Sequence, residues 1–150
     1  MKRRVRQEDD FGCGFACVAY ICDLQYQDVK KFTNNPEKAE AGGYRCKPLC
    51  DILNRIYKQN KIAKVWKTKY VGKTKNPEIP NESILYINKN DKYKYGHYIV
   101  KTKYGYMNPF SNLSEVSGNS KLSIAKYEKD LYGVPSLIIT TENIKYAKDF

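Results

Sequence analysis

Hydrophobic residues recur along this chain with two different spacings, which predict helices in the first part and strands later. Residues 13–22 contain no charged side chain, so a helix beginning near Cys13 would be apolar on every side and therefore buried. A second helix is predicted from about Cys46, since Pro48 is tolerated in a first turn. Its apolar stripe at helical spacing consists of Leu49, Ile52, Leu53, Ile56 and Tyr57.

The remaining pattern predicts a loop and then a series of strands. Residues 28–32 can add one or two helical turns, and residues 34–43 are polar and rich in turn formers, which predicts a loop. Later segments carry the alternating or β-branched and aromatic residues typical of strands: 62–71, 83–87, 97–101, 106–108 and 136–140. A short helix is predicted over 123–131. Helices followed by strands predict an α+β fold, with the helices on one face of an antiparallel sheet.

Length and charge limit the organisation without choosing a function. A chain of 150 residues is expected to form one domain, 1–150, that buries about 70% of the surface of its unfolded chain. The 27 Lys and Arg residues against 16 Asp and Glu residues give a net charge of +11, a long-range bias toward nucleic acid, acidic surfaces or acidic peptides. Lys–Tyr alternation, as in residues 92–95, also fits a nucleic-acid surface. Strands with one wet face give the same alternation, so nucleic-acid binding stays an alternative.

The five cysteines, an odd number, leave at least one thiol unpaired in a monomer, which predicts a reducing, cytoplasmic environment. Residues 11–24 are too short to span a bilayer, and we expect no targeting segment and no membrane partner. Zinc is an alternative, but two cysteine pairs have helical spacing rather than the tight knuckles of structural zinc sites: Cys13 with Cys17, and Cys46 with Cys50. We therefore expect no metal or cofactor.

Cys13 is the first candidate for chemistry because it lies between Gly12 and Gly14 at the start of a predicted helix. Backbone N–H groups and the helix dipole favour a thiolate there. With an imidazolium nearby, the pKa of such a thiol can fall to roughly 3.5–7.5. The two glycines are expected to leave room for a substrate carbonyl. The alternative is that Cys13 is a small apolar core residue.

His97 is the only histidine, and hence the only side chain whose ordinary pKa suits a base near neutral pH. Asn108 is placed to orient it, because a hairpin with an even-length loop sets the two side chains on one sheet face as diagonal neighbours. The alternative for Asn108 is a turn residue before Pro109. Gln7, a short distance before Cys13, could join the Cys13 N–H as an oxyanion donor.

Together these residues resemble a known family. Gln7, the run from Cys13 to Cys17, the segment 97–100 and the pair Asn108-Pro109 are similar to the papain-like peptidases that process bacteriocin double-glycine leaders, in a free-standing form. The resemblance covers nearly the whole chain. It implies a papain-like fold, Cys13 as nucleophile, His97 as base, Asn108 as orienter and Gln7 at the oxyanion hole. Two positions depart from the family pattern: Asn108 stands where Asp is usual, and Gly12 where Asp is common.

The sequence therefore supports the hypothesis of a cysteine hydrolase that cleaves a peptide or isopeptide bond in a peptide or protein substrate. The same residues would serve a deamidase or an acyltransferase. A third reading keeps the scaffold without turnover, as a binding or adaptor module.

Overall fold

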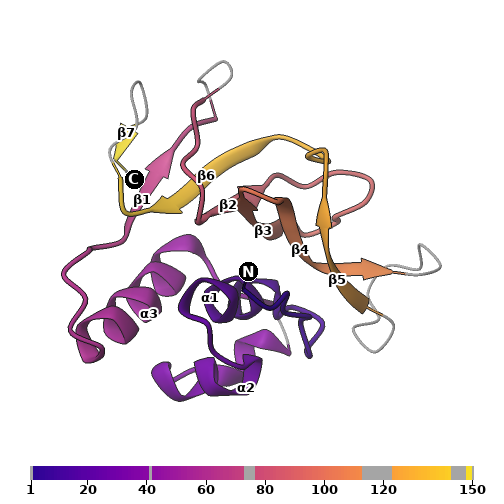
Figure 1. The fold of residues 1–150 in the computed structure, drawn as a ribbon. Helices are drawn as coiled ribbons and strands as arrows, with labels where there is room; N and C mark the ends of the chain where they lie inside the picture. Colours follow the sequence, from indigo (N-terminus) through magenta and orange to yellow (C-terminus); the bar gives the residue numbers. More distant parts are fainter. Residues whose placement is uncertain (1, 41, 73–76, 113–122, 143–147, 150) are drawn as a thin grey trace.

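A computed structural model describes residues 2–40, 42–72, 77–112, 123–142 and 148–149. Helices occupy the N-terminal part of the chain, and the strands that follow form one sheet whose paired neighbours are all antiparallel (Figure 1). The helices lie together on one side of this sheet (Figure 1). The predicted α+β architecture is confirmed at this level.

Two long helices form where the apolar spacing predicts them. Helix α1 spans Cys13–Cys22 and α3 spans Cys46–Gln59, while a short α2, Tyr26–Val29, continues into a 3-10 turn at Lys30–Phe32. The segment 34–43 is not entirely loop as predicted, because a second 3-10 turn occupies Pro36–Ala39. A proline in the first turn fits this, since its fixed φ suits helical backbone.

Among the described residues, the sheet contains seven strands in the order β5-β4-β3-β2-β6-β1-β7. Their bounds are β1 Lys67–Tyr70, β2 Ser83–Ile87, β3 His97–Thr102, β4 Gly105–Asn112, β5 Ser123–Glu128, β6 Pro135–Thr140 and β7 Lys148–Asp149. Strands β3 and β4 form a tight hairpin, in which Thr102 pairs with Gly105. The even-length loop predicted between His97 and Asn108 is therefore present.

Two predicted elements need correction. The helix predicted over 123–131 is wrong, because residues 123–128 form β5, which pairs with β4. The strand predicted over 62–71 is shorter than expected, since β1 begins at Lys67 and the preceding Ile62 and Val65 are exposed. Pairing with a neighbouring strand decides both cases, and it is a long-range interaction that local composition does not carry.

The main core lies between the helices and the sheet. Helix α1 packs against β3, β4, α2 and α3, and its Phe15, Ala16, Cys17, Val18 and Ala19 are fully buried. Helix α3 contributes Leu49, Ile52, Leu53 and Ile56 to the same core. This arrangement fixes the N-terminal end of α1 against the beginning of β3.

Candidate active site

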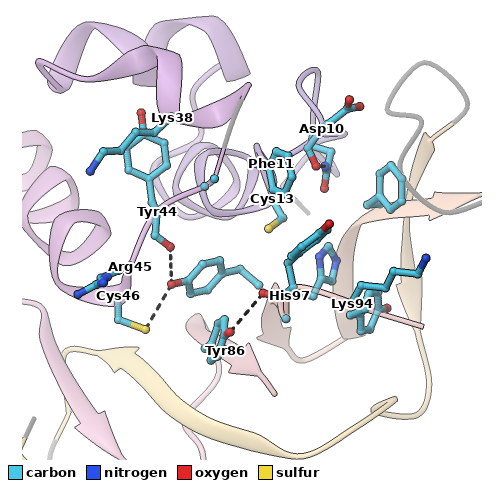
Figure 2. A pocket seen from close by; sticks show the side chains of 18 of the residues that line it. Asp10, Phe11, Cys13, Lys38, Tyr44, Arg45, Cys46, Tyr86, Lys94 and His97 are labelled. Atoms are coloured by element: carbon cyan, nitrogen blue, oxygen red, sulfur yellow. Dashed lines mark hydrogen bonds between the residues drawn. The ribbon is translucent and has the colours of Figure 1, made fainter. Parts of the chain in front are cut away.

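A cleft of about 820 Å³ opens where α1 begins, next to the segment leading into α3 and the loop leading into β3 (Figure 2). Gln7, Cys13 and His97 all line this cleft. Backbone hydrogen bonding from Tyr98, the residue after His97, reaches the Cys13 thiol. Residues distant in sequence but predicted to act together are thus brought to one cavity.

A tight turn before α1 sets the position of Cys13. The Gly12 N–H donates to the Asp9 carbonyl at 3.0 Å, and the Asp9 carboxylate accepts from the Tyr26 hydroxyl at 2.7 Å. Lys30 forms an ion pair with the same carboxylate at 3.0 Å. Cys13 is then the first residue of α1, where N–H groups have no acceptor within the helix.

The glycines beside Cys13 do not leave room for a substrate, contrary to the prediction. A Cβ on Gly14 would come within 2.6 Å of a Leu49 methyl carbon, and a Cβ on Gly12 within 1.9 Å of the Tyr26 hydroxyl oxygen. Both positions therefore face the protein interior. Glycine is required here for close approach of α1 to α3 and of Tyr26 to the turn.

His97 begins β3 and is 5% exposed. One face of its ring stacks on Tyr93, with centroids 4.3 Å apart and an interplanar angle of 16°. Its Nε2 lies 2.7 Å from the Asn108 Oδ1. The prediction that Asn108 would lie on the same sheet face as His97 is confirmed.

The hydrogen bonds around Asn108 determine which way its amide points. Its Oδ1 accepts from the Phe110 N–H at 3.0 Å, while its Nδ2 donates to the Tyr93 hydroxyl at 2.8 Å and to a Glu128 carboxylate oxygen. The oxygen must then accept from His97, which places the ring proton on Nε2. In the neutral ring Nδ1 keeps its lone pair, so it is the nitrogen able to accept a proton.

Burial changes the proton affinities of Cys13 and His97 in opposite directions. It raises the pKa of the half-buried Cys13 thiol to about 11, although nearby backbone N–H groups of Tyr98 and Gly14 oppose the shift. It lowers the pKa of His97 to about 4, which the Asn108 hydrogen bond partly offsets. At pH 7 both shifts favour a thiol and a neutral imidazole over the resting thiolate expected from the sequence.

Gln7 is 2% exposed and joins the site to β4, since its backbone N–H donates to the Pro109 carbonyl at 3.1 Å. Its side-chain Nε2 donates to the carbonyls of Asp9 and Asp10, each at 3.0 Å. Both amide protons are thus used by the turn before Cys13. The structure places Gln7 in the same cleft as Cys13, with its donors directed to the protein backbone.

The rim of the cleft is predominantly basic. The lining includes one carboxylate, Asp10, and five exposed cations, Lys38, Arg45, Lys47, Lys92 and Lys94. Figure 2 shows Lys38 and Arg45 at one end and Lys94 at the other, with Cys13 between them. Aromatic contact also crosses the cleft, since Phe11 and Tyr95 meet with ring centroids 5.5 Å apart.

Sequence reasoning missed two residues of the site, Tyr93 and Glu128. Tyr93 stacks on His97 and accepts from Asn108, and Glu128 accepts from the same amide. No motif marks either residue.

Comparisons with protein-family models, curated proteins and solved structures gave no match to this chain. All five cysteines are free thiols. Within the described ranges, no group of three or more His, Cys, Asp or Glu side chains is arranged to hold a metal ion. In the same part of the chain, no helix has both the length and the apolar character needed to cross a bilayer.

Proposed function

We propose that this protein is a cysteine hydrolase of papain-like type that acts on a peptide or isopeptide bond. The observation that carries the proposal is His97, which is hydrogen-bonded to the buried Asn108 and lines the same cleft as a cysteine at a helix N-terminus. A thiol, a base and a group that holds the base are the parts that nucleophilic catalysis requires.

The proposed reaction begins from the neutral pair. As the Cys13 sulfur attacks the substrate carbonyl carbon, its proton passes to His97 Nδ1, since Nε2 is held by Asn108. The imidazolium then gives this proton to the leaving amine, and a thioester remains on Cys13. Water, deprotonated by the same nitrogen, attacks the thioester to release the acid and restore the thiol.

Burial makes charge separation before attack unfavourable in this cleft. With the pKa of Cys13 raised and that of His97 lowered, an ion pair is less stable than the neutral pair until the sulfur bonds to carbon. Proton transfer is therefore coupled to attack. The oxyanion is received by the first-turn N–H of Cys13, and Gln7 contributes if its Nε2 exchanges a backbone carbonyl for the substrate oxygen.

The papain-like and leader-peptidase assignments belong to the same proposal. They are supported by the order of Gln7, Cys13, His97 and Asn108 in the sequence and by a nucleophile helix facing a sheet that carries the base. A thioester can also be resolved by an amine, or formed from a side-chain amide, so acyl transfer and deamidation use the same residues.

A second candidate is a binding or adaptor module that retains the scaffold without turnover. The raised pKa of Cys13 favours it, because a thiol that stays protonated is a poor nucleophile unless a base assists it. The two candidates differ in whether His97 makes Cys13 reactive.

The test is the rate at which iodoacetamide labels Cys13 between pH 5 and pH 9, read by mass spectrometry of the Cys13 peptide because Cys22 is also half-buried. We expect His97→Ala to slow labelling at pH 7 by about 10²–10⁴-fold. Its remaining rate should rise about tenfold per pH unit toward the raised pKa of the thiol.

Cys13→Ala identifies the background, and Cys22→Ser is the matched control that should leave the rate at Cys13 unchanged. Equal rates below pH 7 in wild type and His97→Ala would remove the hydrolase proposal and favour the adaptor.

A further inference from the structure

Glu128 completes a chain of hydrogen bonds that begins at the imidazole and ends at the protein surface. It is the last residue of β5, and its side chain is 22% exposed. One carboxylate oxygen accepts from the Asn108 Nδ2, and the other lies 3.8 Å from the Lys92 Nζ. The order His97, Asn108, Glu128, Lys92 therefore connects the base to an ion pair.

A neutral Asn108 alone gives little help to a protonated imidazole. His97 is almost fully buried, so an imidazolium formed during the reaction has little water to stabilise it. A carboxylate that accepts a hydrogen bond from the Asn108 Nδ2 polarises the amide. This polarisation increases the negative partial charge on the Asn108 Oδ1, the atom facing the His97 Nε2. Asn108 carries no negative charge, but Glu128, its hydrogen-bond partner, can supply one.

We propose that Glu128 is a positioning residue that acts through Asn108: it fixes the amide with Oδ1 toward His97 and stabilises the imidazolium formed when Cys13 is deprotonated. This role rests on the function proposed above. This role requires the negative charge of Glu128, whereas a residue that only supports the fold would need no more than the same shape and hydrogen bond.

Other groups near the ring set the direction of each expected change. Lys92 opposes Glu128 and lowers the pKa of His97, after the larger effect of burial. Tyr93 remains neutral in the relevant pH range, because burial raises its pKa. The titratable or charged groups that contact this hydrogen-bonded network or line the cleft beside His97 include Cys13 of α1, Asp10 before it, Lys92, Tyr93 and Lys94 before β3, and Glu128 of β5.

The first experiment uses the fact that the chain contains one histidine. In ¹⁵N-labelled protein, the imidazole signals report the tautomer and pKa of His97 without requiring activity. We expect the Nε2–H tautomer in wild type, a lower His97 pKa in Glu128→Gln and a higher one in Lys92→Met. Cys13 labelling at pH 7 should fall about tenfold in Glu128→Gln, the size expected for one screened charge.

Asp130→Asn is the matched control, because it makes the same acid-to-amide change at an exposed position close by in sequence. It should leave the His97 pKa and the labelling rate unchanged. A Glu128 that only supports the fold would lower the melting temperature in Glu128→Gln without changing the His97 pKa or the labelling profile, and this result would overturn the proposal.

Moving the negative charge from position 128 to position 108 gives a sharper test. Asn108→Asp alone sets two carboxylates against each other, so labelling should fall and the protein should be less stable. Adding Glu128→Gln moves the single negative charge next to the imidazole, and labelling should return to at least the wild-type rate with a raised His97 pKa. If the double variant is no faster than Asn108→Asp, the charge of Glu128 has no such role.

The outcomes separate this proposal from the function on which it rests. If wild-type labelling depends on His97 but Glu128→Gln changes neither the imidazole pKa nor the rate, only the role of Glu128 fails. If labelling of the wild type is independent of His97, the hydrolase itself fails, whatever Glu128 does to the ring.

Discussion

The two walls of the cleft are built by different interactions. The helical wall positions Cys13 through the turn at Asp9 and Gly12 and through close apolar packing of α1, as where Gly14 meets Leu49. The sheet wall positions His97 through directed polar bonds to Asn108 and, beyond it, Glu128. Changes on the helical wall should therefore appear mainly as lost stability, and changes on the sheet wall mainly as altered proton affinity.

This difference also explains how a neutral pair can be held ready. Burial of Cys13 raises the pKa of its thiol, because it removes the water that would stabilise a thiolate. The polar bonds around His97 select one tautomer, with Nδ1 as the acceptor, even though burial keeps the ring neutral. In the proposed reaction, the proton starts on the Cys13 sulfur of the helical wall and passes to His97 of the sheet wall.

The largest predicted effect comes from the altered proton affinity on the sheet wall, which makes the stability of the protein depend on pH. The pKa of His97 is about 4 in the folded protein, against an ordinary value of 6.5. As pH falls from about 6.5 to 4, the unfolded state binds a proton that the native ring does not. The free energy of unfolding should thus be fully retained above pH 6.5 and should lose about 3 kcal/mol by pH 4.

Urea unfolding of wild type and His97→Gln between pH 4 and pH 7 measures this effect as the difference between the two stability curves. Because other groups titrate equally in both proteins, the curves should converge or cross as the pH falls. If the two stability curves stay parallel, the His97 ring is not held neutral at low pH. The proposed difference between the two walls would then be wrong.

The next effect belongs to the helical wall. Gly→Ala in a helix ordinarily stabilises by about 1 kcal/mol, but at Gly14 the new methyl would meet two Leu49 methyl carbons at 2.6 and 2.9 Å. We expect Gly14→Ala to destabilise by about 1–3 kcal/mol through overpacking. Urea unfolding at pH 7 measures it, and the His97 pKa should stay unchanged.

Gly14→Ala combined with Leu49→Val is the control, because the shorter side chain withdraws the clashing atoms. The double variant should be more stable than the sum of the two single changes predicts. Additive costs would mean that Gly14 does not act through Leu49, and the helical wall would need another explanation.

The elements of the helical wall could be predicted from the sequence more fully than those of the sheet wall. The apolar run at residues 13–22 and the stripe from Leu49 to Tyr57 predict α1 and α3 because helical spacing is local. His97 and Asn108 were predictable as neighbours because a hairpin is also local. Glu128 was missed because β5 was predicted as a helix, and its pairing with β4 joins segments that no short motif connects.

The spacing of residues in the sequence also gave a wrong prediction of how the site residues are surrounded. A cysteine at a helix N-terminus suggests a thiolate, yet desolvation outweighs the helix dipole and raises the pKa of Cys13. Likewise, the glycines flanking Cys13 suggest access, but Leu49 and Tyr26 fill the space beside them. Both errors concern which neighbours cover a residue, and this depends on how α1 packs against other elements.

The smallest predicted effect is a preference of Cys13 for an anionic alkylating reagent, which tests the different charges of the two walls. The helical side of the rim carries Lys38, Arg45 and Lys47, and the sheet side carries Lys94 and a Lys92 already paired with Glu128. Iodoacetate and iodoacetamide alkylate thiols by the same reaction but differ by one negative charge. Relative to free cysteine, Cys13 should favour iodoacetate by a few-fold in about 10 mM salt, because exposed cations attract an anion before it reacts.

Raising the salt to about 0.5 M should remove this preference, since screening then acts within a few ångströms. Lys47→Gln and Lys94→Gln test one cation from each side, and both are exposed, so neither should alter stability. A larger loss of preference in Lys47→Gln would assign the attraction to the helical side, where none of the three cations forms an ion pair with a described residue. A preference that persists in high salt would mean that iodoacetate is selected by a contact other than the charge of the rim.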